Sequence, residues 1–135
     1  MKQVTFFFIA IFSMCIIFSS CKKSSDPAPT DPGYVGFWKG KYGSATAYPS
    51  SGYSFLFRSN GTVRVFDGND TTTANKAEGT YSITGAAVTS TYTYVGSTSQ
   101  FSVAATIDPK YTFQEGTWGS GINTTNGGKY FIVKQ

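Results

Sequence analysis

The strongest constraint on the fold is a β-type pattern that runs from Tyr34 to the C-terminus. Thr, Val, Tyr and Phe dominate this stretch, Gly and Asn interrupt it at regular intervals, and no segment has the apolar spacing of a helix. Because no helix is expected to provide a crossover, consecutive strands should pair antiparallel, as in an all-β, eight-stranded, antiparallel up-and-down barrel. The predicted strands cover residues 35–43, 52–58, 62–67, 78–84, 87–95, 100–107, 111–119 and 129–134.

The alternation of apolar residues also predicts how neighbouring strands align. If Phe57 and Val63 both point into the barrel, they lie opposite each other across a three-residue loop that ends at Gly61 in a left-handed conformation. Ile83 lies opposite Val88 across a two-residue turn. Both hairpins place their apolar residues on one face.

Two further hairpins follow from the same rule. Tyr94 is expected opposite Phe101, across a loop at residues 96–99. A turn that starts at Asp108 is expected to place Ile107 opposite Tyr111. The agreement of four hairpins in their inward face predicts a meander.

The strand at residues 111–119 does not fit a simple alternation. Glu115 shares a face with Phe113, whereas Trp118 lies on the opposite face. We expect a bulge near Gly116 that returns Trp118 to the interior. In the alternatives, residues 112 and 114 point inward, or Glu115 is a single buried polar group.

The predicted interior is rich in aromatic side chains. An eight-stranded barrel is just wide enough to be filled by side chains or to hold one small ligand. Large aromatic residues on nearly every strand favour a filled core, and the same rings would line a pocket if one is present. The predicted inward set is Trp38, Tyr42, Phe55, Phe57, Val63, Val65, Tyr81, Ile83, Val88, Tyr92, Tyr94, Phe101, Val103, Ile107 and Trp118. The candidate ligand-binding residues within it are Trp38, Phe57, Tyr81, Tyr92, Tyr94 and Trp118.

Gly36-Phe37-Trp38, at the first predicted strand, resembles the G-x-W motif of lipocalins and the wider calycin group. The resemblance implies a lipocalin-like barrel in which Trp38 plugs one end. In that family an Arg packs on this Trp; Lys129 and Lys134 are the candidates to replace it.

The N-terminus predicts export. Lys2 precedes a largely apolar run, Val4–Phe18, which is shorter than the roughly 20 residues of a spanning helix and suits a signal peptide. The next residues, Ser19-Ser20-Cys21, resemble the lipobox of bacterial lipoproteins. The resemblance implies that residues 1–20 are removed and that Cys21 carries the lipid; a simple secreted protein is the alternative.

The expected organisation is therefore a signal peptide at 1–20, a lipidated Cys with a flexible, Pro-containing linker at 21–33, and a barrel at 34–135. The lipid on Cys21 would attach the protein to a membrane in the cell envelope of a Gram-negative bacterium. The expected location is the outer membrane, with both the periplasmic and the surface side open.

Composition argues against most catalysis. The chain has no His, and its two Cys lie at position 15, within the signal peptide, and at the lipidation site, so the commonest general base and the commonest zinc and copper ligands are missing. We therefore expect no enzymatic activity, no cofactor and no metal. A formal net charge of +4, spread over many segments, predicts no nucleic-acid binding.

Two function hypotheses remain. The first is a lipid-anchored protein that binds a small apolar or aromatic molecule in the barrel. The alternative is a surface module with a packed core that contacts glycan or protein through end loops such as Gly68–Lys76 and Ser120–Gly128. Within the first loop, Asp70-Thr71-Thr72 resembles an O-glycosylation motif of exported bacterial proteins, which implies Thr71 as the modified residue. The sequence identifies no protein partner.

Overall fold

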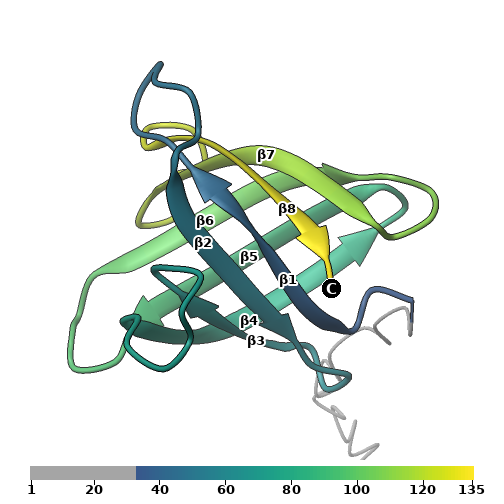
Figure 1. Cartoon of the computed structure of the whole chain (residues 1–135), viewed down its shortest axis with the longest axis horizontal. Helices are drawn as coiled ribbons and strands as arrows, with labels where there is room; N and C mark the ends of the chain where they lie inside the picture. Colours follow the sequence, from purple (N-terminus) through teal and green to yellow (C-terminus); the bar gives the residue numbers. More distant parts are fainter. Residues whose placement is uncertain (1–32) are drawn as a thin grey trace, which may run out of the picture.

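The computed structural model describes residues 33–135, which form a closed barrel of eight antiparallel strands. Each strand pairs with the next along the chain, and β8 pairs with β1 to close the sheet (Figure 1). The predicted fold class, an all-β, lipocalin-like, up-and-down barrel, is confirmed. The described residues contain no helix long and apolar enough to cross a membrane. The strands are β1 (Gly36–Tyr42), β2 (Ser51–Phe57), β3 (Thr62–Phe66), β4 (Lys76–Thr84), β5 (Ala87–Tyr94), β6 (Gln100–Ile107), β7 (Phe113–Ser120) and β8 (Gly128–Lys134).

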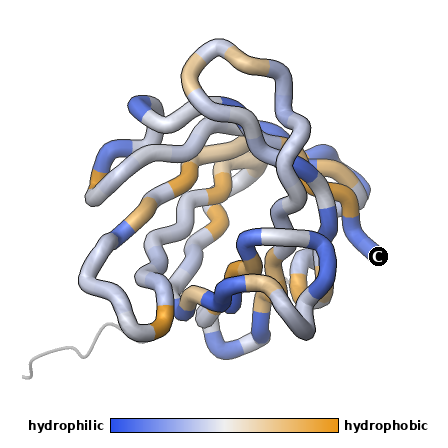
Figure 2. The backbone as a smooth tube through the Cα atoms, turned by 60° about the vertical axis from the view of Figure 1, so that its left-hand side comes forward, coloured by the Kyte–Doolittle hydropathy of each residue, from blue (hydrophilic) through white to orange (hydrophobic). Residues whose placement is uncertain are grey.

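The barrel interior contains every residue of the predicted inward set, either buried or packed against the buried cluster. Along the chain trace, hydrophobic segments are short and separated by hydrophilic ones, as expected when successive side chains point to opposite faces (Figure 2). The core also includes residues outside that set, most of them at positions that continue the alternation of their strands: Tyr34, Tyr53, Ala77, Ala105, Tyr111, Tyr130 and Ile132.

The first two predicted hairpins are confirmed. Phe57 lies opposite Val63, and Gly61 takes a φ of +77° in the loop between them. Ile83 lies opposite Val88 across the two-residue turn. These turns align β2 with β3 and β4 with β5, and they place the inward apolar residues of each pair on one face.

The alignment of β5 with β6 differs from the prediction by two residues. Phe101 lies opposite Tyr92 rather than Tyr94. The backbone N–H of Val95 donates to the carbonyl of Lys76, at 2.8 Å, so β5 continues to pair with β4 after it has separated from β6. Because the difference is an even number of residues, every side chain keeps its predicted face.

The turn between β6 and β7 is longer than predicted. Ile107 lies opposite Gln114, so the expected pairing with Tyr111 was wrong. The Asp108 carboxylate accepts hydrogen bonds from the backbone N–H groups of residues 110, 112 and 113, which holds three further residues in the turn. Tyr111 adopts a left-handed conformation there, with a φ of +54°, and its side chain packs against the core.

The pairing of β6 with β7 is thus shifted by three residues from the predicted one. Because three is an odd number, the shift explains the irregular alternation of β7 without a bulge, so the expected bulge near Gly116 was wrong. The pairing of β7 with β6 and with β8 is continuous along the strand. Trp118 reaches the interior because the longer turn exchanges the two faces of β7. Gln114 points inward and is fully buried, Thr112 is exposed in the turn, and Glu115 is exposed on the outer face.

The two ends of the barrel carry different loops (Figure 1). The end at which β1 begins, which we call the closed end, carries the loops at 58–61, 85–86 and 108–112. The opposite end, which we call the open end, carries the loops at 43–50, 67–75, 95–99 and 121–127.

Tyr34 and Trp38 fill the closed end. Both are fully buried, and the Tyr34 ring lies 5.0 Å from Trp38 and 4.4 Å from Phe57, measured between ring centroids. The Trp38 indole N–H donates to the carbonyl of Tyr34 at 3.0 Å. Tyr34, two residues before β1, therefore folds over the barrel and seals it.

The two lysines considered as replacements for the family's Arg lie at opposite ends of β8. Lys134 is the register partner of Trp38, and its ammonium group donates to the carbonyl of Gly33 at the closed end. Lys129 is exposed on the outer wall near the open end. Only Lys134 is placed beside the closed end.

Gln114 bridges two buried tyrosines inside the barrel. The Tyr34 hydroxyl donates to Gln114 Oε1, and Gln114 Nε2 donates to the Tyr130 hydroxyl. A buried amide costs free energy unless it is hydrogen-bonded, and here both of its polar atoms have a partner. The bridge ties the segment before β1 to β7 and β8.

Replacing Gln114 by Leu is expected to lower the free energy of unfolding by about 2–4 kcal/mol, because two buried hydroxyls lose their partner. Urea unfolding of the full chain, purified in detergent, measures the change. Adding Tyr34→Phe and Tyr130→Phe should recover most of the loss, since replacing all partners by apolar groups removes the unpaired atoms. Glu115→Gln, on the outer face, is the matched control. A Leu variant as stable as wild type would contradict the bridge.

Candidate functional site

A pocket of about 180 Å³ lies inside the barrel at the open end. Its side chains come from five strands and from the residue that follows β3, and they point inward where the strands end. We call it the mouth pocket. Its lining is Tyr42, Tyr53, Asp67, Tyr92, Tyr94, Phe101 and Trp118.

Part of the lining of the mouth pocket is a series of aromatic rings in contact with one another, which runs from β2 through β1 and β7 to β6. The ring of Tyr42 lies 5.1 Å from Tyr53 and 5.7 Å from Trp118, measured between ring centroids. Trp118 lies 6.2 Å from Phe101, and its indole N–H donates to the carbonyl of Gly43 at 3.0 Å. This hydrogen bond fixes the indole at the edge of the pocket.

The two tyrosines of β5 complete the ring of aromatic side chains. Tyr94 lies 5.6 Å from Phe101, and Tyr92 lies 6.1 Å from both Tyr94 and Phe101. The Tyr92 hydroxyl is hydrogen-bonded to that of Tyr53, which returns the chain of contacts to β2. Six aromatic side chains thus surround one small space.

Asp67 is the charged residue of the mouth pocket. The Tyr42 hydroxyl donates to Asp67 Oδ1 at 3.0 Å. The two ion pairs found among residues 33–135 join Glu78 to Arg58 and to Arg64, so neither involves Asp67. Burial raises the pKa of Tyr94 far above its ordinary value, and the nearby Asp67 charge raises it further.

The size of the mouth pocket limits what it can hold. Drug-sized ligands occupy pockets of roughly 300–1,000 Å³, whereas an apolar cavity of about 150 Å³ in another protein holds one benzene molecule. At about 180 Å³, the mouth pocket suits one ring or one compact branched group.

Sequence reasoning located half of the candidate binding residues at this pocket. Tyr92, Tyr94 and Trp118 line it. The other three, Trp38, Phe57 and Tyr81, belong to the closed end, where each contacts Tyr34.

Two lining residues were not predicted to point inward, although the alternation contains the signal for both. Tyr53 is two residues before Phe55 in β2, and Asp67 is two residues after Val65 in β3. Tyr42 and Phe101 were in the inward set but not among the candidate binding residues.

The modification sites proposed from the sequence lie elsewhere. Cys21, the signal peptide and most of the linker lie outside the described residues. Thr71 lies in the loop between β3 and β4, where Asp70 accepts hydrogen bonds from the Thr72 backbone N–H and the Thr73 hydroxyl. Across residues 33–135, no group of three or more His, Cys, Asp or Glu side chains is arranged to hold a metal ion.

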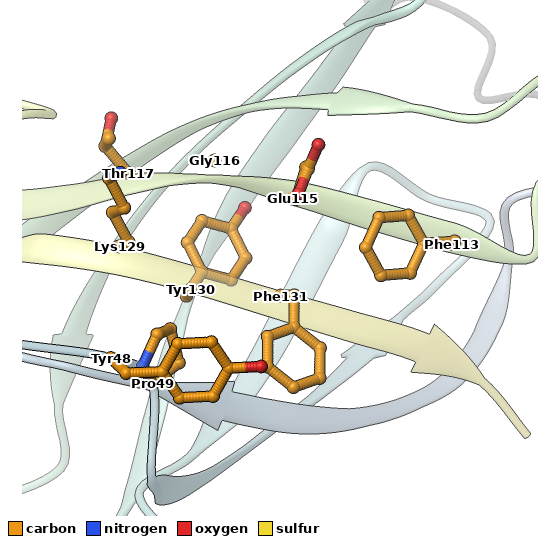
Figure 3. A pocket seen from close by; sticks show the side chains of 9 residues that line it. All are labelled: Tyr48, Pro49, Phe113, Glu115, Gly116, Thr117, Lys129, Tyr130 and Phe131. Carbon is orange, nitrogen blue, oxygen red and sulfur yellow. The ribbon is translucent and has the colours of Figure 1, made fainter.

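A second hollow, of about 610 Å³, lies on the outer wall of the barrel over β7 and β8. Figure 3 shows Phe113, Glu115 and Thr117 on β7, Lys129 and Phe131 on β8, and Tyr48 with Pro49 from the loop at 43–50. Tyr48 is 82% exposed, and the rings of Phe113 and Phe131 stack at 6.3 Å. We call this the outer groove. It is larger than the mouth pocket, but it is open to solvent and lacks a surrounding ring of side chains.

A comparison with protein-family models, curated proteins and solved structures found no match for this chain. The site geometry and the sequence therefore carry the functional argument.

The barrel is expected to lose stability above about pH 10, because burial raises the pKa of Tyr34, Tyr53, Tyr92 and Tyr130 far above the value of about 10 in an unfolded chain. The unfolded chain then releases protons that the folded barrel keeps. Stability is complete below pH 10 and falls by up to about 1.4 kcal/mol per pH unit for each such tyrosine.

Urea unfolding midpoints measured between about pH 8 and pH 11 test this slope, and tyrosinate absorbance reports the ionisation directly. Tyr130→Phe removes one of these four tyrosines, so the loss of stability per pH unit should be smaller by the contribution of one tyrosine. Stability that stays constant to pH 11 would show that these hydroxyls ionise in the folded state.

Proposed function

We propose that this protein is a lipid-anchored protein of the cell envelope that binds one small molecule with an apolar or aromatic surface at the open end of its barrel. The mouth pocket carries the proposal. It is a space of single-ring size, surrounded by six aromatic side chains and placed at the end of the barrel that Tyr34 does not seal. Such a space, with few and converging polar groups, is typical of a ligand site.

The closed end supports this choice of site. There, Tyr34, Trp38 and Phe57 are fully buried or nearly so and contact one another, and the polar atoms of Gln114 are hydrogen-bonded. At the open end, by contrast, Tyr42, Tyr94 and the other partly buried rings leave space between them. A ligand of modest size would complete the packing at that end only.

Binding rather than catalysis fits the same residues. The carboxylate of Asp67 has no His or Cys to act with it, since the chain lacks His and the body of the domain lacks Cys. The anchor at Cys21, the outer membrane as its location and the absence of a cofactor form part of the proposal and rest on the sequence.

A second candidate function rests on the outer groove, which favours recognition of a glycan by the barrel wall rather than by the end loops predicted from sequence. Tyr48, Phe113 and Phe131 offer flat rings, and Glu115 and Lys129 offer hydrogen-bonding groups. Exposed amphipathic rings of this kind mark interaction sites.

For the leading function, benzyl alcohol is expected to bind saturably to the full chain, purified in an uncharged maltoside detergent, and to change tryptophan emission. 1-Naphthalenemethanol should not compete, because two fused rings exceed the mouth pocket. Trp118→Phe should abolish the emission change while calorimetry still detects binding, since Trp38 lies at the closed end. Absence of any saturable heat with benzyl alcohol would refute the function.

For the second candidate, Tyr48→Ala is expected to remove the retardation of the protein by hydroxyethyl cellulose in a native gel. Ile122→Ala is the matched control, because Ile122 is an exposed apolar residue of another open-end loop and does not line the outer groove. Equal mobility of wild type and Tyr48→Ala would reject glycan binding in the groove.

A further inference from the structure

The mouth pocket carries a negative charge without a matching positive one. Asp67 is its charged residue, and no Lys or Arg is among its lining residues. The nearest lysine along the following loop, Lys76, directs its ammonium group to the carbonyl of Thr72 at 3.3 Å. Lys41 and Lys129, on the neighbouring strands, lie on the outer face of the barrel. The Asp67 carboxylate is exposed to solvent, so it can face a cationic ligand at the mouth of the pocket.

The hydroxyls of three of the four ring tyrosines are already engaged. The Tyr42 hydroxyl donates to Asp67, and the hydroxyls of Tyr53 and Tyr92 bond to each other. A ligand in the pocket thus meets mainly ring surfaces, the Tyr94 hydroxyl and one carboxylate. This arrangement disfavours a ligand that needs several hydrogen bonds, because its donors would lose water without gaining partners.

Aromatic rings attract cations electrostatically, most strongly when the cation is desolvated and within about 6 Å of the ring centroids. Quaternary ammonium groups suit such a ring of side chains, because they carry a positive charge, have an apolar surface and have no N–H donor. Their compact, branched shape also suits a space of about 180 Å³. Trp118 and the four tyrosines provide the most favourable ring types for this contact.

We propose that the mouth pocket is an aromatic cage for a small organic cation with a trimethylammonium head group, in which Asp67 supplies the opposing charge. The proposal rests on the proposed function of the mouth pocket and specifies its ligand class. Trp118, Phe101 and Tyr94 provide one wall, and Tyr42, Tyr53 and Tyr92 provide the other.

The test compares two probes of nearly equal shape, choline and its uncharged carbon analogue 3,3-dimethylbutan-1-ol. Calorimetry with the full chain in maltoside detergent should give at least about tenfold tighter binding of choline, which corresponds to about 1.4 kcal/mol of cation-specific attraction. Glycerophosphocholine and trimethyllysine, measured alongside, distinguish a lipid head group from a modified peptide as the source of the same cation.

Asp67→Asn keeps the shape of the side chain and removes its charge, so it should remove most of the preference for choline over the uncharged analogue. Asp70→Asn is the matched control. Asp70 is an exposed carboxylate in the same loop, does not line the pocket, and as Asn retains an acceptor for the Thr72 N–H. Tyr94→Leu should likewise weaken the binding of choline more than the binding of dimethylbutanol. This variant tests the proposal if Asp67→Asn does not fold.

The outcomes separate the inference from the function on which it rests. Equal affinity for choline and dimethylbutanol would overturn the cation cage while leaving a small-molecule site in place. Binding of neither probe, together with no binding of benzyl alcohol, would refute both. A choline preference that survives both Asp67→Asn and Tyr94→Leu would place the cation elsewhere and overturn the cage.

Discussion

The pairing of β8 with β1 is the interaction on which the rest of the structure depends. Five consecutive register pairs, from Trp38 with Lys134 to Tyr42 with Tyr130, join the last strand to the first. Without them the sheet would have two free edges and its aromatic face would be open to water. Closure turns that face into an interior, and it also brings Tyr34, two residues before β1, within reach of Gln114 in β7.

Closure also makes the two ends chemically different although both are rich in tyrosine. At the closed end, Gln114 supplies an acceptor to one hydroxyl and a donor to another, so the polar groups are satisfied within the protein. At the open end the hydroxyls of Tyr53 and Tyr92 satisfy each other, and Asp67 brings a net charge. The Asp67 carboxylate is exposed to solvent, so its attraction for a cation at the mouth of the pocket would weaken as salt is added.

Much of the fold is predictable from alternation alone, because a β-strand has a fixed two-residue period and one buried face. The inward residues of β2 to β6 follow directly from it. The length of the turn after Ile107 does not, because the Asp108 carboxylate holds it through hydrogen bonds to three backbone N–H groups. The early separation of β5 from β6 depends on a contact of Val95 with Lys76, 19 residues away.

The candidate site was predictable in part for the same reason. Tyr92, Tyr94 and Trp118 are large and alternate with polar residues, so their inward direction and their aromatic character are visible in the sequence. That Asp67 lies beside Tyr42 depends on the order in which strands surround the barrel, which no single segment contains. The distinction between a filled end and an end with a pocket likewise required the three-dimensional arrangement.

The position of Tyr34 has a consequence for how a ligand would arrive. The described chain enters the barrel at the sealed end, and the loops of the open end lie on the opposite side (Figure 1). If Cys21 carries the proposed lipid, the membrane attachment would join the barrel at its sealed end, and the mouth pocket would lie at the other end. In that arrangement a solute would reach the rings of Tyr94 and Trp118 from the aqueous compartment without crossing the acyl chains. Occupancy would follow the free concentration of the solute in water and would be insensitive to its partitioning into the bilayer.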